Sequence, residues 1–322
     1  MNASRQPPVR GGLLAGAGFS FSLALAATIT HLPGVNLEHA VAQLAGAQRL
    51  PLMGAFVLFV ASLALSAFAW RSAVVECGGR VGRTRSAACF GAGSLVNSLA
   101  PARLGDAVRI GLFSRELPGR GRLWAGGGIL AAMSAFQGVS MVVLVAIAAW
   151  LGAIPPWAAA LPAAPTVGAV VLARRARRRG SRSGSSRLLD VFAAFGQSPR
   201  HTYRPVGWLT AALCCRLGAA ALTAAAFGMP APTTAAVVLI PAVEIATLLP
   251  LTPGNLGLTS AAVAIALHTT GTSLTQAVAV GIGFHAAEMA AGLAYGLASA
   301  VYLLGTRPSV GTFADAALAP HA

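Results

Sequence analysis

Residues 52–70 read LMGAFVLFVASLALSAFAW, and this run decides the fold class. It carries no charged residue and is about as long as the ~20 apolar residues that a helix needs to cross a bilayer. The further predicted spans are 11–30, 124–152, 156–173, 206–227, 232–250, 256–269 and 275–304. We therefore expect an all-α integral membrane protein with about eight transmembrane helices and one or two re-entrant or broken segments.

The composition excludes an ordinary water-soluble protein. Of the 322 residues, 56% are hydrophobic and only 10% are charged, and the mean hydropathy is +0.72. The net charge of +15 would suggest a nucleic-acid partner in a soluble protein, but every basic residue is an arginine lying mostly between apolar runs, and no base-reading motif occurs. We expect no nucleic-acid partner. The four cysteines lack metal-ligand spacing, so we also predict no metal site and no cofactor.

The arginine distribution predicts the orientation in the membrane. With the N-terminus inside, 21 of the 23 arginines fall at cytoplasmic ends or loops, Arg49 falls outside and Arg216 falls within a span. We expect a multi-pass protein of the cytoplasmic membrane with both termini cytoplasmic. The predicted parts of this single membrane domain, 1–322, are an N-terminal half at 12–173, an arginine-rich cytoplasmic linker at 174–205, a C-terminal half at 206–304 and a disordered tail at 305–322.

Two stretches interrupt the helical pattern at membrane depth. Ser86 to Pro101 is apolar but too short to cross and return, and arginines flank it on both sides, which predicts a re-entrant hairpin. Residues 250–257 contain two prolines and two glycines, and such backbone is tolerated only inside protein or beside a water-filled cavity. Residues 99–105 and 251–257 share the frame L-x-P-x-x-L-G. Paired interruptions in two halves of a chain indicate a transporter's binding site.

The first interruption is the richest polar stretch near the membrane. Its predicted headgroup-binding residues are Asn97, Pro101, Arg103, Gly105, Asp106 and Arg109. The proline and glycine can shape a turn, and the arginine forks can bind a phosphate while the aspartate fixes one of them. The alternative is an interfacial loop that the arginines only anchor. The predicted cavity residues of the second interruption are Pro250, Thr252, Pro253, Gly254, Asn255 and Gly257.

Ionisable residues also lie inside predicted spans, where each needs a partner or a cavity. Arg216 is predicted to pair with Glu244, either as a structural bridge or to bind a charged headgroup. His285 and Glu288 stand three residues apart and share a helix face. We assign Glu244, His285 and Glu288 to charge or proton coupling, with hydrogen-bonded structure as the alternative for the His285–Glu288 face.

The pattern N-x-x-x-P-x-R-x-G-[DE]-x-x-R at 97–109, followed by P-x-T/P-x-G-x-x-G at 250–257, resembles the membrane region of lysylphosphatidylglycerol synthases/flippases. The resemblance covers roughly residues 12–304 and implies a lipid-translocating domain with re-entrant segments. We expect the soluble aminoacyltransferase domain of the bifunctional members to be absent. Family members commonly have a glutamate where this chain has Thr259 and Ser260, and an arginine about where His285 stands, which implies a changed headgroup preference.

The leading functional hypothesis is a flippase-like transporter that moves a phospholipid or polyprenyl-linked headgroup, with membrane lipids as partners. One alternative is a membrane-embedded, lipid-carrier-dependent transferase. It would need a catalytic acid, and the loop 31–49 offers only Glu38 beside His31 and His39, so we predict no enzyme activity. The other alternative is a non-transporting partner subunit of an envelope enzyme. A separate lipid-modifying enzyme is a further candidate partner.

Overall fold

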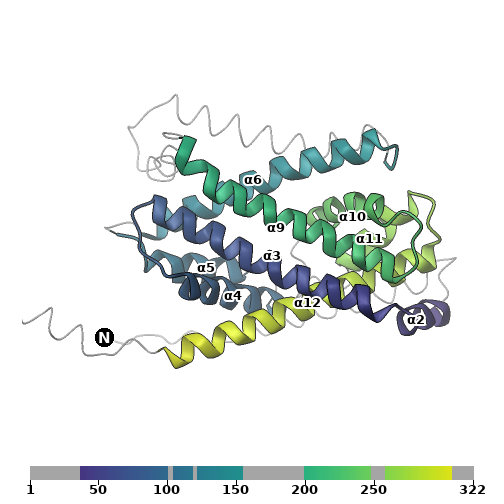
Figure 1. The fold of residues 1–322 in the computed structure, drawn as a ribbon, viewed down its shortest axis with the longest axis horizontal. Coiled ribbons are helices and arrows are strands. Elements are labelled where there is room, and N and C mark those ends of the chain that lie inside the picture. Colours follow the sequence, from purple (N-terminus) through teal and green to yellow (C-terminus); the bar gives the residue numbers. More distant parts are fainter. Residues whose placement is uncertain (1–36, 101–103, 119–121, 155–198, 248–257, 307–322) are drawn as a thin grey trace, which may run out of the picture.

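The computed structural model describes residues 37–100, 104–118, 122–154, 199–247 and 258–306. These ranges are helical and contain no strand, which confirms the all-α class (Figure 1). The helices are α2 (Leu37–Ala45), α3 (Arg49–Glu76), α4 (Arg83–Leu99), α5 (Leu104–Ser114), α6 (Arg122–Trp150), α9 (Pro199–Ala226), α10 (Pro232–Thr247), α11 (Leu258–His268) and α12 (Leu274–Gly305).

Four of the described helices are long and apolar enough to cross a membrane. They are α3, α6, the Tyr203–Ala226 part of α9, and α12. These helices correspond to the expected spans 52–70, 124–152, 206–227 and 275–304, whereas 11–30, 156–173, most of the linker and most of the tail lie outside the described residues.

Within the described residues, the expected spans 232–250 and 256–269 are not helices long enough to cross a bilayer. They correspond to α10 with 16 residues and α11 with 11 residues, both shorter than the ~20 residues that a crossing needs.

Helices α4 and α5 form a helical hairpin whose two outer ends meet. The guanidinium of Arg85, in the first turn of α4, donates to Glu116, two residues beyond α5, at 2.6 Å. The amide of Arg80 also donates to the carbonyl of Glu116. Because both outer ends lie at one end of the bundle, the pair enters and returns on the same side. The bounds of the predicted re-entrant hairpin are wrong, because Ser86 to Leu99 belongs to the single uninterrupted helix α4 and the returning helix is α5.

Helices α10 and α11 form a second such pair at the opposite end. Ala226, the last residue of α9, accepts a hydrogen bond from the amide of Gln48, which immediately precedes α3. Gln276, in the first turn of α12, donates from its side chain to the carbonyl of Phe227. Helix α10 starts shortly after α9 ends, and α11 ends shortly before α12 starts, so both outer ends of this pair lie at that end (Figure 1).

The described chain therefore repeats one order of elements with inverted direction. A long helix, a short hairpin and a long helix occur as α3, α4–α5 and α6, and again as α9, α10–α11 and α12. The interruptions that share the L-x-P-x-x-L-G frame fall between the two helices of each hairpin. Inverted repeats of this kind place binding sites of transporters near the middle of the membrane, where the repeats meet.

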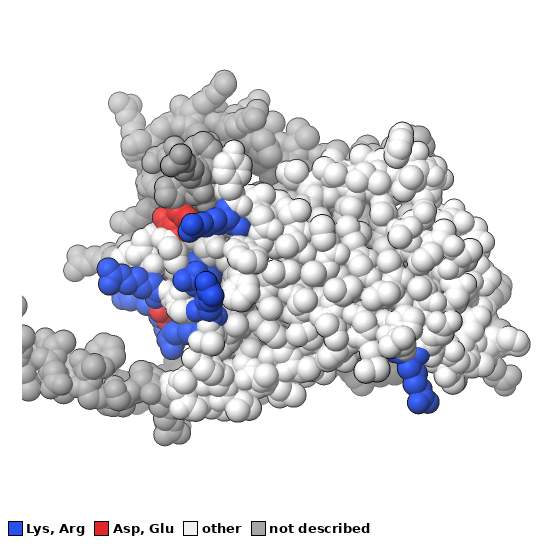
Figure 2. All heavy atoms as spheres, viewed as in Figure 1, with Lys and Arg blue, Asp and Glu red and all other residues white. Residues whose placement is uncertain are grey.

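Charged side chains gather at one end of the molecule, which we call the arginine end and define by Arg83, Arg85, Arg115 and Arg122. Figure 2 shows basic side chains clustered at one end and an uncharged surface over most of the remaining described face. Large apolar side chains such as Ile265, Leu297 and Val301 are exposed on the helices, as expected for surfaces that face lipid. Arg49 begins α3 at the opposite end.

Two apolar clusters pack the two ends of the bundle. Around α10 and α11, the rings of Phe59 and Phe284 meet edge to face at 5.2 Å, and around α4 and α5, Trp70 stacks on Phe113 at 5.0 Å. Because lipid tails are as apolar as these side chains, close packing rather than removal of water stabilises such contacts. The remaining space at the centre is lined by polar and charged as well as apolar side chains.

Candidate functional site

A polar cavity of about 390 Å³ lies where the two hairpins approach each other. Side chains of α3, α4, α5, α6, α9, α10, α11 and α12 line it. Six serines line its wall, namely Ser62, Ser66, Ser94, Ser98, Ser134 and Ser140. Four of them donate their hydroxyl hydrogen to a carbonyl three or four residues earlier in their own helix, so they present oxygen lone pairs to the cavity.

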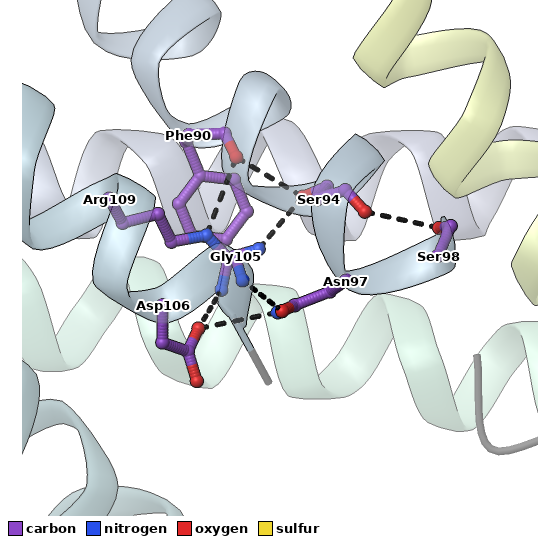
Figure 3. Close-up of polar contacts among 7 residues, drawn as sticks. All are labelled: Phe90, Ser94, Asn97, Ser98, Gly105, Asp106 and Arg109. Atoms are coloured by element: carbon purple, nitrogen blue, oxygen red, sulfur yellow. Dashed lines mark hydrogen bonds and ion pairs between the residues drawn. The ribbon is translucent and has the colours of Figure 1, made fainter. Parts of the chain in front are cut away.

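Asn97 ties the two helices of the first hairpin together (Figure 3). Its side-chain oxygen accepts from the amide of Gly105 at 2.7 Å, and its side-chain nitrogen donates to Asp106 at 3.4 Å. The first turn of α5 has backbone N–H groups without helical partners, and Asn97 supplies an acceptor for one of them from the neighbouring helix. Asp106 stands in the same turn, where the positive end of the helix dipole favours a carboxylate.

Arg109 is the second connection within this hairpin. Its guanidinium donates to Asp106 and to the hydroxyl of Ser94, both at 2.8 Å, and it stacks 3.9 Å from the ring centre of Phe90 (Figure 3). The sequence predicts that Asp106 fixes one of the arginines, and the ion pair with Arg109 confirms it. Arg109 also lines the cavity, but these bonds keep it within its own hairpin, so phosphate binding by Arg109 stays a prediction.

Glycine is required at position 105 by close packing rather than by backbone angles. A Cβ there would overlap the carbonyl oxygen of Gly93 and the side chain of Asn97. The other predicted residues of this motif, Pro101 and Arg103, lie outside the described residues. So do the residues of the second motif, Pro250, Thr252, Pro253, Gly254, Asn255 and Gly257.

Arg216 forms the ionic centre of the cavity. One amino group binds Glu244 of α10, as the sequence predicts, and the other donates to Glu288 of α12 at 3.1 Å. The Glu244 side chain is 11% exposed and that of Glu288 is 32% exposed. One guanidinium thus faces two carboxylates, and the group carries a formal charge of −1. Such a group is stable at membrane depth only where protein and water replace lipid.

His285 lines the cavity one helical turn before Glu288 on α12. It is nine-tenths buried, and neither ring nitrogen has a hydrogen-bond partner among the described residues. Thr259, which stands at the start of α11, lines the same cavity. The cavity thus brings together Asn97, Asp106 and Arg109 of the first motif with all four ionisable residues predicted within the spans.

Sequence reasoning missed Gln137 and Ser94. Gln137 of α6 donates to Glu244 at 2.6 Å, and Ser94 accepts from Arg109. An amide inside the apolar run 124–152 was a usable signal, because a polar side chain at that depth needs a partner. Ser94 offered no comparable signal, since serine in a membrane helix can satisfy its hydroxyl on its own backbone.

The arrangement suits binding and movement of a polar group. Among the described residues, no group of three or more His, Cys, Asp or Glu could hold a metal ion. The walls offer carboxylates, serine oxygens, two amides and two guanidiniums that already have partners. A polar ligand can enter such a site by exchanging one of these partners.

The comparisons with known proteins agree with this architecture. No curated protein matches the chain in sequence. The family model of the lysylphosphatidylglycerol synthase TM region matches residues 13–296, which is most of the chain. The chain, with its inverted helical hairpins around a polar intramembrane cavity, therefore belongs to the lysylphosphatidylglycerol synthase TM region family.

Proposed function

We propose that this protein is a flippase-like transporter that moves the headgroup of a phospholipid or polyprenyl-linked lipid through the cavity while the acyl chains stay in the bilayer. The observation that carries the proposal is the ionic centre of Arg216, Glu244 and Glu288 inside a polar cavity at the meeting point of the two hairpins. Charges at this depth are costly unless they serve a polar pathway.

A headgroup phosphate can bind Arg216 by exchange. Arg216 needs one carboxylate for neutrality, yet it holds two. Glu288 is the weaker partner of Arg216. Its carboxylate lies 3.1 Å from the guanidinium, and its side chain is more exposed than that of Glu244. Glu244 is held further by a hydrogen bond from Gln137. The planar guanidinium can then donate two parallel hydrogen bonds to a phosphate. Release of the phosphate restores the contact with Glu288, so the site can bind and release in cycles.

Lipid movement in proteoliposomes tests the proposal. The purified full chain is reconstituted with a panel of fluorescent phospholipids and polyprenyl phosphates, and a membrane-impermeant quencher reports how fast each lipid changes leaflet. We expect at least one anionic lipid to move faster than in protein-free vesicles. Arg216→Lys should slow this movement, because lysine keeps the charge but loses the fork, whereas Arg49→Lys, at the opposite end, should not.

The same assay separates the alternatives. A transferase would convert a carrier lipid into a new product, which mass spectrometry of the extracted lipids would detect. A non-transporting partner subunit would move no lipid, and neutral substitutions at Arg216 and Glu288 would leave its assembly intact.

We place the protein in the cytoplasmic membrane with the arginine end and both termini on the cytoplasmic side, since Arg/Lys excess marks cytoplasmic loops. Its partners are membrane lipids and, as a candidate, a separate lipid-modifying enzyme.

A further inference from the structure

His285 is a cavity residue whose side chain takes no part in the ionic centre. It is 9% exposed, and both ring nitrogens are shut off from solvent without a hydrogen-bond partner among the described residues. A neutral imidazole carries one N–H donor and one acceptor, and leaving both unmade in a buried position is unfavourable. In the observed state, therefore, His285 can still form a hydrogen bond with a group that moves next to it.

Glu288 is the carboxylate best placed to become that partner. It follows His285 by three residues in α12, and side chains at that spacing are neighbours on one helix face, with Cβ atoms about 5–6 Å apart. The other carboxylates of the cavity have more partners. Asp106 is held by Arg109 and Asn97, and Glu244 by Arg216 and Gln137. The described cavity residues of α3, α4, α6 and α11 are uncharged.

Ligand binding to Arg216 would displace Glu288 from its present contact. In the observed state it shares Arg216 with Glu244, which leaves one carboxylate more than the guanidinium requires. An anionic ligand that binds Arg216 would displace the more exposed and more distant of the two. The displaced carboxylate would stay in the cavity, where an unpaired charge is costly. It therefore needs a donor within reach.

We propose that His285 is a positioning residue that holds the Glu288 carboxylate in a second position, away from Arg216, when a ligand binds Arg216. Without ligand, Glu288 binds Arg216 and His285 is unpartnered; with a phosphate on Arg216, Glu288 turns to accept the N–H hydrogen bond of His285. The switch rests on the proposed lipid binding and concerns how the bound state is stabilised. It gives a role to a histidine whose ring nitrogens have no hydrogen-bond partner among the described residues.

A double-mutant cycle on lipid binding tests the switch. Phosphatidylglycerol is titrated into the detergent-purified full chain, and native mass spectrometry gives its affinity. His285→Leu should weaken binding about tenfold, because the displaced carboxylate loses a hydrogen bond to a charged group. In a Glu288→Ala background, where no carboxylate has to be displaced, the same substitution should change binding less than twofold. Equal losses in the two backgrounds would mean that His285 is merely structural, and would overturn the inference.

Matched controls keep the outcome specific. His285→Gln retains an N–H donor and should restore most of the affinity. His268→Leu removes a histidine that lies outside the cavity at the end of α11, and should leave binding unchanged. Diacylglycerol, which has no phosphate, should bind equally to the wild type and to His285→Leu. A phosphate-independent loss would contradict the switch.

A second measurement observes the His285 ring directly. In protein labelled with ¹⁵N at histidine, the ring signals of His285, assigned with His285→Gln, should shift when phosphatidylglycerol is added to the wild type but not to Glu288→Ala. Unchanged ring signals in lipid-bound wild type would overturn the inference. Binding that shows this coupling without any lipid movement in proteoliposomes would instead contradict the proposed transport, so the two failures are distinguishable.

Discussion

The carboxylate of Glu288 lies 3.1 Å from Nη2 of Arg216, and this contact joins α12 to α9 across the polar cavity. Because Glu244 occupies the other amino group, removing Glu288 still leaves a neutral pair, whereas removing Arg216 leaves two facing carboxylates. We expect Arg216→Gln to lower the free energy of unfolding by about 3 kcal/mol and Glu288→Gln to change it by less than about 1 kcal/mol. Thermal unfolding in detergent measures both. Equal destabilisation would show that the two carboxylates do not share one guanidinium.

Gly105→Ala should destabilise the first hairpin by about 1–3 kcal/mol, because the added methyl group overlaps the Gly93 carbonyl and the Asn97 side chain. Gly111→Ala on the same helix is the control, since a Cβ at that position meets nothing within 4 Å. Alanine also favours a helix by up to about 1 kcal/mol over glycine. The control should therefore be neutral or stabilising in the same thermal assay. A loss at position 111 as large as at 105 would contradict the packing argument.

Arg109→Lys should slow lipid movement while the protein still inserts. Lysine keeps the charge but cannot donate to Asp106 and Ser94 from one planar group, so the hairpin loses hydrogen bonds contributing about 1–2 kcal/mol. Arg115→Lys is the control, because Arg115 is exposed beyond the end of α5. Proteoliposome transport and chromatographic homogeneity give the two readouts. Normal transport by Arg109→Lys would place the working residues at Glu244, His285 and Glu288.

Cysteine labelling tests the orientation. In a variant with Cys77, Cys89, Cys214 and Cys215 replaced, a membrane-impermeant maleimide applied to intact cells should label Arg49→Cys and spare Arg83→Cys. These positions begin α3 and α4 at opposite ends of the bundle. Position 178 in the expected linker should behave like position 83. Labelling of position 83 or 178 from outside would reverse the proposed topology.

The sequence predicted those features that depend on local pattern. Apolar runs identified the four long helices, and isolated charges identified the ion pair of Arg216 and Glu244. The hairpin expected within Ser86 to Pro101 is instead formed by two helices, α4 and α5. Partners supplied by distant elements could not be read in this way. That Glu288 shares Arg216, and that Gln137 reaches Glu244, depends on how α6, α10 and α12 cross, which no periodicity encodes.

The packing of α4 against α12 has a consequence for biogenesis. Gly91 of α4 abuts Ser299, Gly296 of α12 abuts Leu95, and Tyr302 hydrogen-bonds Thr84. A hairpin of two short helices cannot shield its own charged side chains from lipid. Helix α12, which packs along α4, lies far downstream of the first hairpin in the chain. The face of α4 that packs against α12 therefore has no partner until α12 has been translated, and a truncation before α12 would leave Gly91 and Leu95 without the helix that they contact.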